Sequence, residues 1–167
     1  QGEIGEIWLR GPNIIPGYWG KPEATEASFA GGWFRSGDLG YADEEGLYYV
    51  VDRKKDVIIR GGENIYCAEV EAALLEHPLV KDAAVVGLPH PDYGEEVAAI
   101  VQARAEHAGT DLASILAADL AAGLAKFKIP TVFRIVEEDL PRTATGKVLK
   151  REIRETYFQR EAATAAR

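Results

Sequence analysis

The stretch that decides the fold is residues 51–66, which read VDRKKDVIIRGGENIY. Its second half places Val57-Ile58-Ile59 and Asn64-Ile65-Tyr66 on either side of Gly61-Gly62, a pattern typical of a β-hairpin. Its first half is a run of charged residues that offers few apolar contacts. We therefore expect a hinge between two domains at residues 52–56 and a hairpin at the start of the second domain.

Downstream of this stretch, short apolar runs alternate with helix-like segments. Strands are expected at 80–86, 97–103 and 132–136, and helices at 68–76, 110–124 and 148–157. The sequence thus predicts an α+β domain over residues 57–167, with a three-stranded sheet packed by helices plus the β-hairpin.

Upstream, residues 1–51 are broken every few positions by glycine or proline. Strand-like runs lie at 6–10 and 47–51, and one or two helical turns at 23–29. Because this β-rich segment has too few apolar residues for a core of its own, we expect it to pack on further chain. The absence of methionine also leads us to expect a piece of a longer protein.

Composition excludes several function classes. The chain has 167 residues, of which 47% are hydrophobic, and a net charge of −8. This acidity disfavours nucleic acid as a partner, and no apolar run approaches the roughly 18 residues of a transmembrane segment. The single cysteine, Cys67, cannot form an internal disulfide, which fits a cytoplasmic location and a buried, inert thiol.

Two short segments are basic within this acidic chain. The first spans 52–60 and the second 141–154. Each is either a solvated charged face or a surface that meets the phosphates of a ligand.

Individual residues in these and neighbouring segments could carry chemistry, although each also has a structural explanation. Asp38 follows Ser36-Gly37 in a glycine-bounded loop; it is either a turn residue or a carboxylate that accepts ribose hydroxyls. Gly61-Gly62 is either a hairpin turn or a place where backbone approaches a ligand. Lys147 lies on a glycine-containing loop, TGKV, which lacks the spacing and the Ser or Thr of a P-loop.

Together and in this order, these motifs are specific. The chain resembles the C-terminal end of the AMP-forming acyl-CoA synthetases, of the acyl-adenylate-forming superfamily, and is most like the fatty-acyl-CoA ligases. The resemblance runs from Gly5-Glu6-Ile7 to about Tyr157 and includes GYW at 17–19 and KPEAT at 21–25.

The resemblance implies a role for each part of the chain. Residues 1–51 would be the last β-subdomain of a large N-terminal domain, and residues 57–167 a mobile lid. The implied site residues are Asp38 and Arg53 for the ATP ribose, Lys55 and Asp56 for the hinge, Gly61, Gly62, Glu63 and Asn64 for the pantetheine of CoA, and Lys147 for catalysis of adenylation.

The resemblance also implies ATP (leaving as AMP), CoA and a small carboxylic acid as substrates. Mg²⁺ is expected with ATP in the full-length enzyme, and no metal site is expected within these residues. The missing N-terminal domain would carry the phosphate loop and the acyl pocket, so we expect this chain to be inactive alone.

Two alternatives remain open. One is an adenylation domain that loads the phosphopantetheine of a carrier protein. We favour CoA because KKD followed by RGGEN at 54–64 resembles the CoA ligases, whereas carrier-loading domains more often read Gly-Arg-x-Asp at the hinge. The other is a non-catalytic module that binds a nucleotide or a partner.

Overall fold

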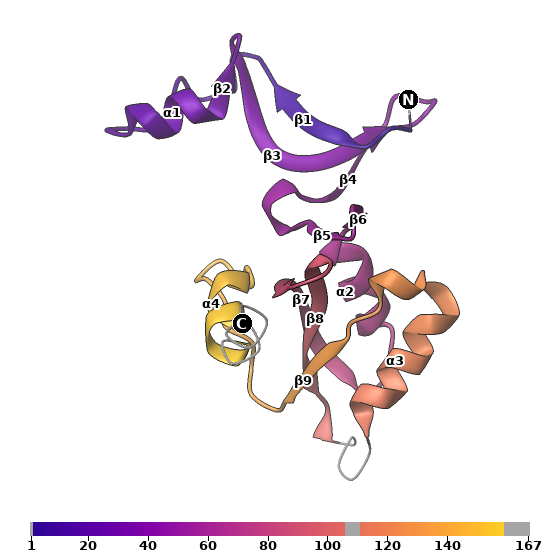
Figure 1. Ribbon diagram of the computed structural model, residues 1–167. Coiled ribbons are helices and arrows are strands. Elements are labelled where there is room, and N and C mark those ends of the chain that lie inside the picture. Colours follow the sequence, from indigo (N-terminus) through magenta and orange to yellow (C-terminus); the bar gives the residue numbers. More distant parts are fainter. Residues whose placement is uncertain (1, 106–110, 159–167) are drawn as a thin grey trace. The chain divides into compact units, whose positions relative to one another are not determined.

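The computed structural model of the chain divides into two compact units, Gln1–Lys55 and Asp56–Arg167 (Figure 1). The structure describes residues 2–105 and 111–158. The boundary between the units falls inside the segment 52–56 that the sequence marks as a hinge. The last part of the expected lid, 159–167, lies outside the described residues, as does Thr110 at the expected start of a helix.

The first unit is a four-stranded antiparallel sheet with one short helix, α1 (Pro22–Ser28). The long strand β3 (Trp33–Ala42) is its centre; β1 (Gly5–Leu9) pairs along one edge, and β2 (Phe29–Ala30) and β4 (Tyr48–Arg53) pair with it on the other. The β-rich character expected from the sequence is therefore present.

The strand β3 corrects the expectation that Asp38 lies in a glycine-bounded loop. Two glycines that suggested a loop lie inside this strand. Gly37 has a φ of 74° and Gly40 lies against the neighbouring strand, where an added Cβ would lie 2.4 Å from the carbonyl oxygen of Tyr49. Both positions thus need glycine within a strand, and the glycines do not end it.

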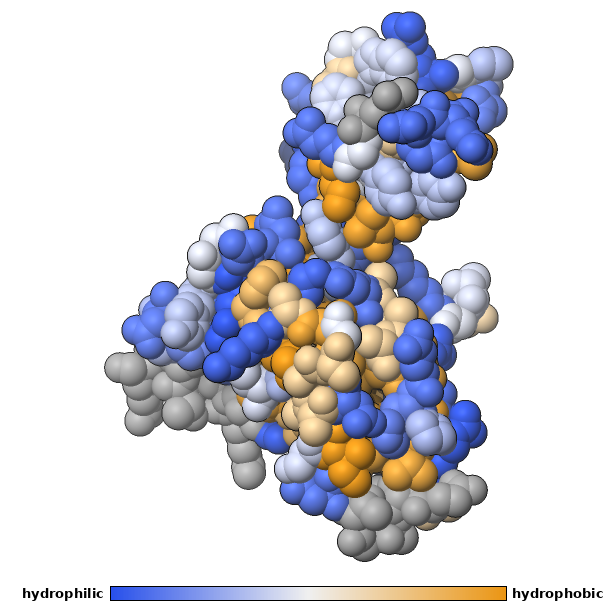
Figure 2. All heavy atoms as spheres, turned by 90° about the vertical axis from the view of Figure 1, so that its right-hand side faces the viewer, coloured by the Kyte–Doolittle hydropathy of each residue, from blue (hydrophilic) through white to orange (hydrophobic). Residues whose placement is uncertain are grey.

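None of the apolar side chains of residues 2–55 is buried in this chain. Trp19 is 100% exposed, Tyr48 76% and Val50 68%. Figure 2 shows apolar residues at the surface of this unit. The sheet has no hydrophobic core of its own, as its composition suggested.

The second unit contains a five-stranded sheet in which β7 (Val80–His90) and β8 (Gly94–Ala103) form a long hairpin. On the other edge of β8 lie β9 (Val132–Val136), which runs parallel to it, and β5 (Ile58–Arg60), which joins it through the pair Arg60↔Gly94. The strand β6 (Glu63–Ile65) pairs with β5. The α+β class is confirmed, and the expected hairpin extends the expected three-stranded sheet.

Helices cover both faces of this sheet (Figure 1). The helices α2 (Cys67–Leu75) and α3 (Leu112–Gly123) pack on one face, and α4 (Lys150–Tyr157) packs on the other. Successive side chains of β7 alternate between the two faces, so that Ala83 and Val85 contact α2 and α3 while Ala84 and Val86 lie on the α4 side. Central strands buried on both faces explain the unbroken apolar runs in the sequence.

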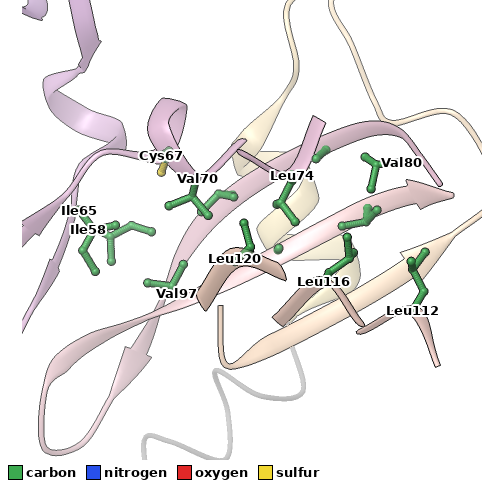
Figure 3. Close-up of a cluster of buried hydrophobic side chains, with 14 of the residues drawn as sticks. Ile58, Ile65, Cys67, Val70, Leu74, Val80, Val97, Leu112, Leu116 and Leu120 are labelled. Atoms are coloured by element: carbon green, nitrogen blue, oxygen red, sulfur yellow. The ribbon is translucent and has the colours of Figure 1, made fainter. Parts of the chain in front are cut away.

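The cluster between the sheet and helices α2 and α3 is the larger core (Figure 3). It includes Ile58 and Ile65 from the hairpin and Leu112, Leu116 and Leu120 from α3. Cys67 is completely buried in it, as expected for an inert thiol. In the part of the chain that the structure describes, no helix has the length and apolar character needed to cross a membrane.

Candidate active-site residues

Asp38 and Arg53, the two residues expected at a ribose, are brought together by the sheet of the first unit. They are register partners in the β3–β4 ladder, and Arg53 Nε lies 2.6 Å from Asp38 Oδ1. The two side chains keep 45% (Arg53) and 31% (Asp38) of their surface exposed. The pair is therefore pre-formed and partly exposed, and Asp38 Oδ2 has no hydrogen-bond partner among the described residues.

A bulge in β3 presents Asp38 in this way. Between the pairs Glu6↔Leu39 and Trp8↔Arg35 the register shifts, so that Ser36, Gly37 and Asp38 stand opposite one residue of β1. Ser36 holds the bulge: its Oγ donates to the carbonyl of Ile7 at 2.7 Å and accepts from the Asp38 amide at 3.0 Å. Bulges commonly redirect a side chain in this manner. Sequence reasoning missed this role of Ser36, because only the strand pairing reveals it.

Of the two expected hinge residues, Asp56 is itself held by a hydrogen bond, and Lys55 lies between it and Lys54, which is held as well. On one side, Lys54 Nζ donates to Glu6 Oε2 at 3.0 Å, a hydrogen bond that is the main cause of the lowered pKa of Glu6. On the other side, the Cys67 thiol donates to the carbonyl of Asp56 at 2.9 Å. Lys55 is exposed and is the last residue of the first unit. Each of these two hydrogen bonds lies within one unit, and Lys55 stands between them in the sequence.

Gly61 and Gly62 form the two-residue turn between β5 and β6. Their φ angles are 59° and 89°, both in the left-handed region, as a type I′ turn requires. Glu63 and Asn64 follow in β6 and are exposed. A Cβ on Gly62 would meet nothing within 4 Å, so the tip of this hairpin is open backbone.

The β7–β8 hairpin supports this turn through residues that sequence reasoning did not select. The Gly61 amide donates to the carbonyl of Tyr93 at 2.8 Å, and the Arg60 guanidinium lies 4.5 Å from the centre of the Tyr93 ring. Arg60 Nε is buried with no hydrogen-bond partner among the described residues. Tyr93 is distant in sequence, and no local pattern marks this contact.

Lys147 lies in a short hydrogen-bonded hairpin within the glycine-containing loop that the sequence indicated. The Thr143 amide donates to the carbonyl of Lys147 at 2.8 Å, and the Lys147 amide donates to Thr143 Oγ1 at 3.1 Å. Gly146, with a φ of 85°, allows the turn. The Lys147 side chain is exposed, and no ion pair engages its ammonium group among residues 2–105 and 111–158.

Other cations of the basic segment 141–154 form ion pairs with carboxylates. Arg142 pairs with Asp82, Lys150 Nζ lies 2.7 Å from Glu71 Oε1, and Arg151 Nε lies 3.3 Å from Glu155 Oε1. These three cations have carboxylate partners, whereas the Lys147 ammonium pairs with no carboxylate within residues 2–105 and 111–158.

The segments that contain Lys147 and Gly61-Gly62 pack on opposite faces of the sheet. The residues flanking the glycine turn, Ile58 and Ile65, belong to the cluster under α2 and α3. Val148, next to Lys147, packs into the cluster on the α4 side. One domain therefore carries two distinct candidate surfaces.

The described residues offer no metal site of protein ligands. No three His, Cys, Asp or Glu side chains within 2–105 and 111–158 are grouped closely enough to hold one ion. The Mg²⁺ expected with ATP has no candidate set of ligands in this part of the chain.

Comparison with known proteins identifies the family of the second unit. Residues 69–147 match the model of the AMP-binding enzyme C-terminal domain. This chain carries an AMP-binding enzyme C-terminal domain. The match begins inside α2, includes β7, β8, α3 and β9, and ends at Lys147.

Two curated proteins that this chain resembles over most of its length are CoA ligases. The chain is 48% identical over 152 residues to the 2-succinylbenzoate–CoA ligase of Geobacillus kaustophilus, covering 91% of this chain and 30% of the relative. It is 45% identical over 154 residues to the long-chain-fatty-acid–CoA ligase of Bacillus subtilis, covering 92% of this chain and 27% of the relative. The chain thus spans under a third of the length of these relatives.

A solved structure has the same fold. The o-succinylbenzoate CoA synthetase of Bacillus subtilis, in complex with its acyl-adenylate intermediate, is 43% identical, with a TM-score of 0.83 over 91% of this chain and 30% of that one. The likeness covers residues on both sides of the unit boundary.

Proposed function

We propose that this chain is the C-terminal part of an ATP-dependent carboxylic acid–CoA ligase that makes acyl-CoA through an acyl-adenylate. In the first half-reaction a carboxylate oxygen attacks the α-phosphorus of ATP and pyrophosphate leaves. In the second, the thiol of CoA loses its proton and attacks the acyl carbonyl, and AMP leaves. The CoA ligases at 45% and 48% identity support this reaction class.

One observation carries the proposal: the segments that contain Lys147 and Gly61-Gly62 pack on opposite faces of one sheet. Adenylation needs a cation at the phosphate, and thioester formation needs a passage for the thiol arm of CoA. A rotation of the second unit about the segment near Lys55 would exchange one surface for the other.

Lys147 is the proposed catalytic residue of the first half-reaction. Negative charge builds on the phosphate and carboxylate oxygens in its transition state, and a positioned ammonium stabilises that charge. One such donor is worth about 10²–10³-fold in rate. The hairpin and the absence of a described ion pair leave the Lys147 side chain available for this contact.

Asp38 and Arg53 are the proposed ribose-binding pair. The Arg53 guanidinium holds Asp38 Oδ1 at 2.6 Å, and the carboxylate side chain keeps 31% of its surface exposed. A carboxylate accepting two adjacent hydroxyls is a common way to bind ribose.

Gly61, Gly62, Glu63 and Asn64 are proposed to contact the pantetheine arm of CoA. The open backbone of the Gly61-Gly62 tip allows close approach of a thin, extended ligand. Lys55 and Asp56 would form the hinge between the half-reactions.

The acid is proposed to be a fatty or related carboxylic acid. One relative is named for 2-succinylbenzoate and another for long-chain fatty acids, at similar identities to this chain. The preferred acid is therefore to be measured with the full-length ligase.

The test is pyrophosphate release from ATP by the full-length protein that contains this chain, over a ladder of carboxylic acids. CoA and a phosphopantetheine-bearing carrier protein are compared as acceptors. Acid-dependent release with acyl-CoA as product supports the proposal. Product on the carrier protein alone would favour the carrier-loading alternative.

The 167-residue chain alone provides the second arm of this test. We expect it to release no pyrophosphate and to bind AMP and CoA weakly. Tight binding of either ligand by this chain, with an inactive full-length protein, would favour a non-catalytic module.

A further inference from the structure

Two polar side chains on the β7–β8 hairpin point toward the face that carries Lys147. Asp82 and Gln102 are register partners at the far end of this hairpin. Gln102 continues the row of Ala98 and Ile100, which pack on the α4 side. It is 3% exposed and is the only buried polar or charged residue among those that the structure describes.

A bulge gives Asp82 the same orientation. Val80 packs on the α2–α3 side, so regular alternation would turn Asp82 to that side as well. The register shifts between Val80 and Asp82, and beyond it Ala83 lies on the α2–α3 side and Ala84 on the α4 side. The extra residue thus sends the Asp82 carboxylate toward the segment that leads to Lys147.

Gln102 holds the beginning of the segment that leads to Lys147, at residues 137–139. Its Nε2 donates to the carbonyl of Glu137 at 3.1 Å and to Asp139 Oδ1 at 2.8 Å. Lys81 Nζ donates to the same Asp139 oxygen at 2.9 Å, and the bonds from Gln102 and Lys81 together lower the pKa of Asp139. A buried Gln102 amide that lost these partners would be left unsatisfied. The two hydrogen bonds from Gln102 therefore favour one position of residues 137–139 relative to the sheet. Leu140, buried at 3% exposure, follows directly.

Asp82 fixes the hairpin itself through Arg142. Asp82 Oδ2 accepts from Arg142 Nη2, and Arg142 Nη1 donates to the carbonyl of Gly146 at 2.6 Å. Asp82 Oδ1 is held by the Ala83 amide at 2.9 Å. One guanidinium therefore links a rigid strand of the sheet to the residue directly before Lys147.

We propose that Asp82 and Gln102 are positioning residues for Lys147, acting through Arg142 and Asp139 on the backbone of the hairpin. This inference rests on the proposed role of Lys147 in adenylation. The ammonium must reach the same point in each catalytic cycle, and a displacement of 1 Å can cost about 10²-fold in rate. Because the bonds tie the hairpin to β7 and β8, Lys147 would move with the second unit as one body.

The test compares Asp82→Ala, Asp82→Asn and Gln102→Ala with Lys147→Ala in the full-length ligase. Acyl-adenylate formation and the conversion of supplied acyl-adenylate to thioester are measured separately. We expect Asp82→Ala to lower kcat of adenylation about tenfold or more, with KM for ATP and acid and the thioester step within about twofold of wild type. Asp82→Asn, which keeps an acceptor for Arg142, should lose less.

Glu155→Gln is the matched control, because it removes the exposed Arg151–Glu155 pair on α4 without touching the hairpin. It should leave both half-reactions unchanged. Amide hydrogen exchange at Thr143 and Lys147 in the full-length protein should accelerate in Asp82→Ala and not in Glu155→Gln.

The outcomes separate this inference from the proposed function. Loss of adenylation in Lys147→Ala with normal adenylation in Asp82→Ala and Gln102→Ala would overturn the inference alone. Normal adenylation in Lys147→Ala would overturn the role of Lys147 itself. Equal losses of both half-reactions in the milder Asp82→Asn would show a general structural role and would also overturn positioning.

Discussion

Arg53 Nε donates to Asp38 Oδ1 at 2.6 Å across the β3–β4 ladder. A bulge stabilised by Ser36 turns Asp38 to this position, and both side chains remain partly exposed. Two strands of one sheet thus prepare a carboxylate whose geometry is set before any ligand arrives. Such pre-organisation lowers the side-chain entropy that the pair itself would lose on binding a ligand.

The first prediction concerns this pair. Asp38→Asn in the full-length protein should raise KM for ATP about tenfold or more, because hydrogen bonds to a charged group contribute about 1.5–3 kcal/mol. The measurement is pyrophosphate release as a function of ATP concentration. Glu44→Gln, an exposed carboxylate in the β3–β4 connection, serves as the control and should leave KM unchanged. An unchanged KM in Asp38→Asn would remove this residue from the ribose site.

The second prediction concerns the packing of β3 against β4. Gly40→Ala should destabilise the first unit by about 1–3 kcal/mol, because its Cβ would lie 2.4 Å from the Tyr49 carbonyl oxygen. Gly5→Ala is the matched control, since a Cβ at Gly5 in β1 meets nothing within 4 Å. Thermal unfolding of the full-length variants measures the difference. Equal stability of the two variants would contradict the close approach of the strands.

The third prediction concerns the hinge. Lys55→Pro should slow the thioester half-reaction more than adenylation, because proline fixes φ and also restricts the preceding residue. Lys55→Ala keeps the backbone free and should have little effect on either step. Rates of the separate half-reactions provide the test. If Lys55→Pro behaves like Lys55→Ala in both steps, the rotation takes place elsewhere.

Much of the second unit could be predicted from the sequence because its signals are local. The strand at 132–136 has the expected bounds, and the Gly61-Gly62 turn required two left-handed residues that only glycine adopts easily. The expected strand 80–86 was too short, because the β7–β8 ladder continues through His90 and Gly94. Backbone hydrogen bonds sustain the ladder beyond the apolar run.

The first unit was harder to predict. Gly37 and Gly40 suggested a loop, yet one lies in a bulge and the other in a tight strand contact. Pairing of Asp38 with Arg53 depends on the register of two strands, which no local pattern encodes. For the same reason the sequence did not reveal the links from Asp82 to Arg142 or from Gly61 to Tyr93.

Lys147 is proposed to serve adenylation and to be withdrawn for thioester formation. The most direct measurement compares Lys147→Ala with Arg154→Ala, another exposed cation of the same basic segment, in both half-reactions of the full-length protein. Lys147→Ala should slow acyl-adenylate formation about 10²-fold or more, while supplied acyl-adenylate is still converted to thioester and Arg154→Ala remains like wild type. Equal loss of both half-reactions in Lys147→Ala, or no loss in either, would contradict the claim.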